Sequence, residues 1–239
     1  MLPRYTTILS FVAVMVCLPI GLSPANAQWS DSARPASRHL VQTSDAVVYT
    51  QPPIGSGVLF PSSWWSQGGT VYGQYVWDDF TLSSAQSITE IRWEGGYDPA
   101  KAGAGGPVQD FTLAIHASIP GGSEPDVVNP PLATYQTAGK AGETAAGTFD
   151  GTTLYDYHYA LPAAFPAAAG QKYWVLIAAM QGGEPDWGLA VGSGGDGQHY
   201  RKIAAPGSVR YARVSGDAAF SLLGRPLASY NVYLPVVRR

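Results

Sequence analysis

The chain has 239 residues, of which 46% are hydrophobic and only 13% are charged, and its formal net charge is −3 at pH 7. This mildly acidic balance argues against a basic face for nucleic acid or for an anionic membrane surface. Gly (28 residues) and Pro (19 residues) are abundant, which is typical of a turn-rich β protein rather than a helical one.

The N-terminus has the three parts of a secretory signal peptide. Arg4 supplies the positive start, Ile8 to Ile20 is a nearly unbroken apolar run, and Ala25-Asn26-Ala27 places small residues before a cleavage point. The apolar run is shorter than the roughly 20 residues that a membrane-spanning helix needs. We therefore expect residues 1–27 to be removed and the protein to be secreted or held at the extracellular surface, with no membrane insertion after cleavage.

The only cysteine, Cys17, lies inside this predicted signal peptide. The exported chain would therefore have neither a disulfide nor a cysteine metal ligand. Val16 precedes Cys17 where a lipoprotein signal needs a small residue, so lipid attachment is not expected. A hydrophobic core has to stabilise such a protein, and a chain of this length can bury one.

The rest of the chain divides into three segments. Residues 28–44 are mostly polar, and their few apolar residues show no regular spacing. They are expected to form a flexible leader. Residues 45–224 show short apolar runs of period two between Gly/Pro clusters, which is the pattern of β-strands. Residues 225–239 form a C-terminal tail with one more strand candidate.

Period-two alternation is clearest in three stretches, residues 75–82, 90–94 and 111–116. No long amphipathic helix interrupts the pattern, and the best helix candidate, residues 163–169, is cut by Pro166 and is expected to be a loop. The sequence therefore predicts an all-β fold, a single antiparallel β-sandwich that is jelly-roll-like. Further strand candidates are residues 132–136, 152–160, 173–179, 187–191, 198–203, 208–213, 218–223 and 229–234.

Several motifs together resemble a group of bacterial secreted β-sandwich proteins of largely unknown function, over about residues 70–224. The motifs are WDDFTL at 77–82, IRWEGGY at 91–97, GQKYWV at 170–175, PDWG at 185–188 and GDAAFSL at 216–222. The resemblance implies a sandwich fold and export from the cell, often to the cell surface. It implies no known catalytic residues. Leu189 departs from the pattern, because a second aromatic residue often follows Trp-Gly in such proteins. The tail VYLPVVRR at 232–239 is similar to short C-terminal ends of exported proteins of Chloroflexota-like bacteria.

Aromatic residues give one sign of a ligand site. Exposed planar rings suit sugar faces, because they stack on C–H groups while nearby polar groups bond the hydroxyls. The alternative is that a second sheet or a loop covers the rings, since large aromatic side chains are usually buried. Candidate ligand-binding residues are Trp64, Trp65, Tyr72, Tyr75 and Trp77.

Three other aromatic residues, Trp93, Trp174 and Phe220, lie in apolar alternation and are expected in the core.

Motifs of common enzymes are missing from the sequence. No serine has the Gly-x-Ser-x-Gly spacing of a hydrolase nucleophile. The four histidines, His39, His116, His158 and His199, form no pair with the usual zinc-ligand spacing. We therefore expect a protein that is not an enzyme.

Carboxylate pairs close in the sequence do not suggest catalysis either. Glycoside hydrolysis needs two carboxyl groups about 5–10 Å apart, and Glu90 and Glu94, four residues apart on one strand, would be separated by about 13 Å. An ion-paired ladder on the surface, bridged by Arg92, explains them better. Glu184 and Asp186 bracket a proline and could bind a sugar or a cation, although acidic residues in such turns are usually solvated.

Asp78 is the most unusual polar residue, because it shares a strand face with Val76 and Phe80, where a carboxylate is costly to bury without a partner. Early and late strands of a sandwich are often neighbours, so Asp78, Asp79 and Asp217 could converge on a Ca²⁺ ion. The alternative is that these carboxylates accept hydrogen bonds from backbone N–H groups.

These patterns leave two main hypotheses for function. The first is a secreted, non-catalytic module that binds carbohydrate or a cell-envelope polymer through the aromatic cluster. The second is a structural or adhesive surface protein without a small ligand, in which the same rings are packed.

Overall fold

The computed structural model describes residues 45–101, 103–205 and 208–227. The predicted signal peptide, the leader and the strand candidate at 229–234 lie outside these residues. Within the described part of the chain, no helix is long and apolar enough to cross a membrane.

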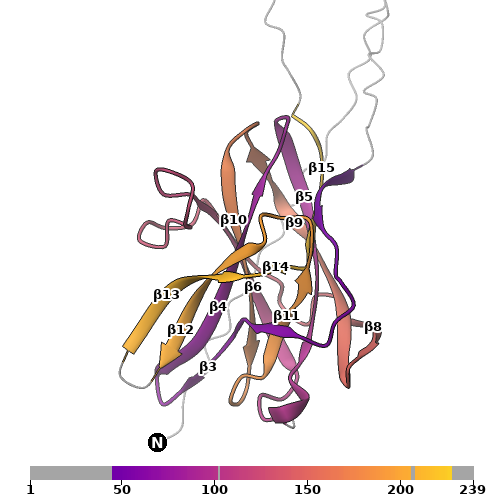
Figure 1. The fold of residues 1–239 in the computed structure, drawn as a ribbon, viewed down its shortest axis with the longest axis vertical. Helices are drawn as coiled ribbons and strands as arrows, with labels where there is room; N and C mark the ends of the chain where they lie inside the picture. The colour runs from indigo at the N-terminus through magenta and orange to yellow at the C-terminus, as the bar shows by residue number, and fades with distance from the viewer. Residues whose placement is uncertain (1–44, 102, 206–207, 228–239) are drawn as a thin grey trace, which may run out of the picture. The chain divides into compact units, whose positions relative to one another are not determined.

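The described residues form two β-sheets (Figure 1). Their only helical segment is a short 3-10 turn, Pro99–Lys101. The all-β sandwich that the sequence predicts is confirmed.

The first sheet has eight strands, and all its pairings are antiparallel. Its main path runs β1 (Ala46–Gln51), β15 (Phe220–Pro226), β5 (Gln86–Tyr97), β11 (Trp187–Gly192) and β14 (Asp217–Ala218). Beside this path, β2 (Leu59–Pro61) pairs with β11, β9 (Thr152–Ala167) pairs with β5, and β8 (Thr144–Phe149) pairs with β9.

The second sheet has seven strands. Their order is β13 (Ser208–Ser215), β12 (Gln198–Ala205), β4 (Thr70–Thr81), β3 (Ser63–Gln67), β10 (Lys172–Gln181), β6 (Val108–Ala117) and β7 (Ala133–Gln136). The long strand β4 pairs with β3 through its first half and with β10 and β12 further along. The β3–β10 pair is parallel, whereas the other pairs of this sheet are antiparallel.

The main core is made of side chains from both sheets, which alternate with outward-facing residues along each strand. Trp93 of β5 and Phe220 of β15 are buried in it, as the sequence predicts. Each large apolar side chain that is fully buried contributes about 1.5–3 kcal/mol relative to an exposed one. This core fixes which side chains of each strand can reach the surface.

A second, smaller cluster lies on the opposite face of the second sheet. Trp174 is buried there rather than in the main core, beside Trp77 and Tyr200. Tyr200 of β12 stacks on Tyr211 of β13 at 6.0 Å between ring centroids, and both rings contact Trp77. The β12–β13 hairpin therefore supplies rings that cover this part of the sheet.

One loop prediction is wrong, because β9 continues through Pro166 to Ala167. β8 pairs only with residues 152–156 of β9. Beyond that point, β5 is the only strand among the described residues that pairs with β9, and the His158 N–H donates to the Ala141 carbonyl of a loop. A proline is tolerated there, since its missing N–H would face the unpaired edge of the sheet.

Candidate functional site

The β3–β4 hairpin divides the predicted aromatic cluster between its two faces. Trp65 lies opposite Tyr72 in the pairing register, and their rings are tilted by 39° with centroids 5.9 Å apart. Trp64 lies opposite Gly73, where an added Cβ would come within 2.6 Å of the Trp64 Cβ. Since neighbouring residues of a strand point to opposite faces, Trp64 and Trp65 cannot contact the same ligand face.

Trp65 and Tyr72 line a hollow of about 290 Å³. Tyr72 is 49% exposed, and Trp65 is partly exposed. Polar groups border the two rings, because Gln74, Lys101 and Glu184 also line the hollow. The arrangement combines aromatic surface with side chains that can donate and accept hydrogen bonds.

The other face of the hairpin is different in character. Trp77 is only 4% exposed, whereas Trp64 and Tyr75 are partly buried against the same cluster. Trp64 and Tyr75 border a second hollow of about 280 Å³ whose other lining residues, Val71, Thr112, Leu176 and Ala178, carry no charge. The structure therefore brings together Trp65 with Tyr72, and separately Trp64 with Tyr75, while Trp77 is covered.

The turn before β11 forms one wall of the first hollow. Pro185 and the exposed Glu184 line it, and Lys101 Nζ donates a hydrogen bond of 2.6 Å to the Pro185 carbonyl. Asp186, by contrast, is buried, so the expectation that it is a solvated turn residue is wrong. Of the two acidic residues, only Glu184 is placed to meet a ligand in this hollow.

Gln181 at the end of β10 holds this turn in place. Its side chain is 2% exposed and makes four hydrogen bonds. Nε2 donates to the Gly106 carbonyl (2.8 Å) and to Asp186 Oδ1 (2.5 Å), while Oε1 accepts from the backbone N–H groups of Asp186 and Trp187 (3.0 Å each). One buried amide thus ties together the turn and the loop before β6.

Each of the three aspartates predicted to bind calcium has its own partners. Burial raises the pKa of Asp78 well above its usual range, although its carboxylate accepts hydrogen bonds from the N–H groups of Ala218 (2.5 Å) and Asp79 (2.7 Å). Asp217 accepts from the N–H groups of Gly195 and Gly197. The sequence argument that early and late strands meet here is confirmed, since Ala218 lies in β14.

Asp79 faces the opposite way from Asp78, because the two are successive residues of β4. Its Oδ2 lies 2.8 Å from Lys172 Nζ. Burial raises its pKa, while the Lys172 ammonium acts against that rise. The described residues contain no group of three or more His, Cys, Asp or Glu side chains that could hold a metal ion, so the three aspartates are not gathered at one point.

Calcium binding by these aspartates stays a prediction, and thermal melting can test it. Ca²⁺ at about 100 times its dissociation constant would stabilise the native state by roughly 2.7 kcal/mol, so chelation is expected to lower the melting temperature. If Asp78, Asp79 and Asp217 hold the ion, Asp78→Asn removes the part of this sensitivity that comes from their site, because the amide lacks the charge that a hard cation prefers. Equal melting temperatures in chelator and in millimolar Ca²⁺ would leave the backbone donors as the only partners of Asp78.

Two of the histidines that the sequence left unassigned are buried. His116 Nδ1 lies 3.0 Å from the Asp126 carbonyl, and His199 Nδ1 lies 2.7 Å from the Gly216 carbonyl. Burial lowers the pKa of both imidazoles. These rings fix chain segments and do not face either aromatic hollow.

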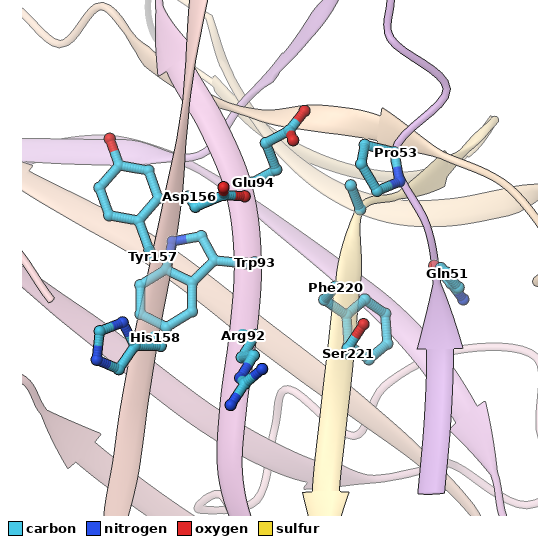
Figure 2. A pocket seen from close by; sticks show the side chains of 11 residues that line it. Gln51, Pro53, Arg92, Trp93, Glu94, Asp156, Tyr157, His158, Phe220 and Ser221 are labelled. Carbon is cyan, nitrogen blue, oxygen red and sulfur yellow. The ribbon is translucent and has the colours of Figure 1, made fainter. Parts of the chain in front are cut away.

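A larger hollow, of about 450 Å³, lies on the outer face of the first sheet (Figure 2). Glu94 of β5 is directly opposite Asp156 of β9, and Arg92 is directly opposite His158. Figure 2 shows the Glu94 and Asp156 carboxyl groups near one end of the lining and His158 and Arg92 near the other. Two acidic and two basic side chains from neighbouring strands therefore share one hollow.

The ion-paired ladder of Glu90, Arg92 and Glu94 that the sequence predicts along β5 is only half correct. Arg92 Nε does contact Glu90 Oε1 at 2.6 Å, but Glu94 is only 7% exposed. Burial raises the pKa of the Glu94 carboxyl, and the nearby Asp156 raises it further. The alternation in residues 152–160 places Asp156 and His158 on one face of a strand, but nothing in the sequence identifies β5 as the neighbour of that strand.

The sequence matches a protein family described as a domain of unknown function (DUF7901) over residues 47–194. This match covers most of the two sheets, including the hairpin of Trp65 and Tyr72 and the residue pair Glu94 and Asp156. No curated protein matches the sequence.

Proposed function

We propose that this chain, which belongs to the DUF7901 family of domains of unknown function, is a secreted, non-catalytic β-sandwich module that binds carbohydrate or a cell-envelope polymer. The observation that carries the proposal is the hollow beside Trp65 and Tyr72. Secretion is supported by the charged, apolar and small-residue parts of the first 27 residues.

The chemistry of the hollow suits a sugar. Each pyranose ring has apolar C–H faces and hydroxyl groups around its edge, so a binding site needs flat apolar surface next to hydrogen-bonding groups. Trp65 and Tyr72 offer the flat surface, at 39° to each other. The Glu184 carboxylate can accept hydrogen bonds from hydroxyl groups, and the Lys101 ammonium can donate them.

The hollow is also held in shape before any ligand arrives. Gln181 fixes the turn that carries Glu184, and Lys101 bonds to the carbonyl of Pro185 in the same turn. A preorganised wall lowers the entropy that ligand binding would otherwise cost.

The alternative, a structural or adhesive protein without a small ligand, is favoured by the other face of the hairpin. There the residues that line the hollow of Trp64 and Tyr75 are uncharged, and the nearby Lys202 ammonium lies over the Tyr75 ring, 4.7 Å from its centroid. Aromatic surface of this kind suits packing against another apolar surface better than it suits a sugar.

Polysaccharide retention separates the two functions. We expect Trp65→Ala and Tyr72→Ala each to weaken retention on an envelope or plant polysaccharide by at least about tenfold, which corresponds to about 1.4 kcal/mol of binding free energy. The measurement is affinity electrophoresis or a pull-down on a panel of insoluble polymers.

Trp64→Ala is the matched control, because it removes the adjacent indole from the opposite face of the hairpin. Retention that is unchanged in this variant, with all variants folded by circular dichroism, assigns binding to the Trp65 face. Loss of retention in Trp64→Ala alone would assign the site to the other face of the hairpin. If the native protein is retained on no polymer, the structural alternative is favoured.

A further inference from the structure

We propose that the Glu94–Asp156 end of the hollow on the first sheet is a calcium-binding site. It is separate from the aspartates around Asp78 and from the aromatic hollow. The proposal does not depend on carbohydrate binding.

The first observation is the position of the two carboxylates. Glu94 and Asp156 are register partners on adjacent antiparallel strands, so their Cβ atoms are expected about 4.5–5.5 Å apart. Both side chains line the hollow (Figure 2). Two carboxylates at this separation can both reach a cation placed between them, since Ca²⁺–oxygen distances are about 2.3–2.6 Å.

The second observation is an oxygen atom without a partner. Glu94 is more than nine-tenths buried, and its Oε1 is enclosed with no hydrogen-bond partner among the described residues. An enclosed acceptor that lacks a donor carries an energetic cost, which is larger when the acceptor is charged. A bound cation would remove that cost, so the atom itself points to a ligand.

The third observation is that the pair has no cation from the protein. Among the described residues, no ion pair joins Glu94 or Asp156 to a lysine, arginine or histidine. Arg92, the basic side chain two residues before Glu94, contacts Glu90 instead. No basic side chain of the described residues therefore neutralises this carboxylate pair.

Calcium fits this position better than magnesium. Two carboxylates supply up to four oxygen ligands, and the open side of the hollow leaves the remaining positions to water. Ca²⁺ accepts such irregular coordination with six to eight oxygens, whereas Mg²⁺ demands a nearly ideal octahedron. With only two protein ligands, we expect a dissociation constant on the order of 10⁻⁴–10⁻³ M, as in other extracellular calcium modules.

Isothermal titration of the purified protein with CaCl₂ at pH 7.5 tests the proposal. We expect saturable binding that weakens at least about tenfold in Glu94→Gln and in Asp156→Asn, because each substitution removes one charged ligand. Asp156 is exposed, so Asp156→Asn is expected to leave the fold intact and keeps the test valid even if Glu94→Gln is destabilised. MgCl₂ is the comparison titrant and is expected to bind more weakly.

Glu90→Gln is the matched control, since Glu90 lies on the same strand face and contacts Arg92 rather than the hollow. Its affinity for calcium is expected to stay within about twofold of the native value, because it supplies no ligand. Three results would overturn the proposal: no saturable heat with the native protein, unchanged affinity in Asp156→Asn, or loss confined to Asp78→Asn, which would assign calcium to the aspartates around β14.

Discussion

Trp187→Ala is expected to lower the free energy of unfolding by about 3–5 kcal/mol. The side chain is 1% exposed in the main core, where its ring meets Phe111 edge-on at 5.0 Å between centroids. Its Nε1–H donates to the Tyr157 hydroxyl at 3.1 Å. The alanine variant would lose the buried area, leave a cavity and remove one of the two hydrogen-bond partners of the buried Tyr157 hydroxyl, which still donates to Glu143 Oε2.

Close packing around this ring prevents the cavity from collapsing easily. Gly95 of β5 lies against the Trp187 ring and against the Gly188 carbonyl, which a Cβ at position 95 would approach to 2.6 Å. Backbone on one side and aromatic rings on the other cannot shift to fill the space. The cost is therefore expected at the upper part of the range.

Thermal and urea unfolding measure the effect. We expect the melting temperature to fall by about 10 °C or more, from about 2–4 °C per kcal/mol for a domain of this size. Trp65→Ala is the control, because a partly exposed ring at the hollow is expected to contribute about 1 kcal/mol or less. Equal losses in the two variants would show that the Trp187 region is not the packed centre of the domain.

Gln181→Ala is expected to destabilise the protein by about 2–4 kcal/mol. The substitution leaves the backbone N–H groups of Asp186 and Trp187 without an acceptor in a buried place, and each such group typically costs about 1–3 kcal/mol. It also removes the donor to the Gly106 carbonyl. The loss of stability exceeds that from removing one ordinary hydrogen bond, because several buried groups lose their hydrogen-bond partner at once.

The same substitution is expected to affect ligand retention. The turn that Gln181 holds carries Glu184 and Pro185, two lining residues of the aromatic hollow. Retention on polysaccharide should therefore weaken in Gln181→Ala although no ligand-contacting side chain has changed.

Gln171→Ala is the matched control for stability and retention. Gln171 precedes the same strand but is exposed, so a change within about 0.5 kcal/mol is expected. A Gln181→Ala variant as stable as Gln171→Ala would mean that solvent replaces the four hydrogen bonds. Normal retention with clear destabilisation would show that the turn does not need Gln181 to shape the hollow.

Local patterns were sufficient to predict the fold class and most strands. Alternation of period two placed Ile91 and Trp93 of β5 on the buried face, and it identified Asp78 as an acidic residue pointing inward. Four short strands, β1, β2, β3 and β8, are missing from the prediction, and the residues of β8 are mostly exposed and show no apolar alternation. Strands that bury little carry little pattern in their sequence.

The candidate sites depend on pairings that local patterns do not contain. The adjacent residues Trp64 and Trp65 look like one cluster in the sequence, but the hairpin register sends them to opposite faces. Glu94 appears to belong with Glu90, whereas its partner across the sheet is Asp156 of a distant segment. Long-range strand order decides both cases, and a single sequence does not specify it.

The edge of β9 after residue 158, along which no strand of the described residues pairs opposite β5, has a consequence for contacts between copies of the chain. An open strand edge presents N–H and C=O groups that invite strand addition by a neighbouring molecule, which is a common route to aggregation. Pro162 and Pro166 both lie in the part of β9 that β8 does not pair with. Since proline has no N–H to donate and its ring blocks close approach, these two residues interrupt any continuous intermolecular ladder along that edge. The two prolines therefore make this part of the β9 edge a poor template for strand addition.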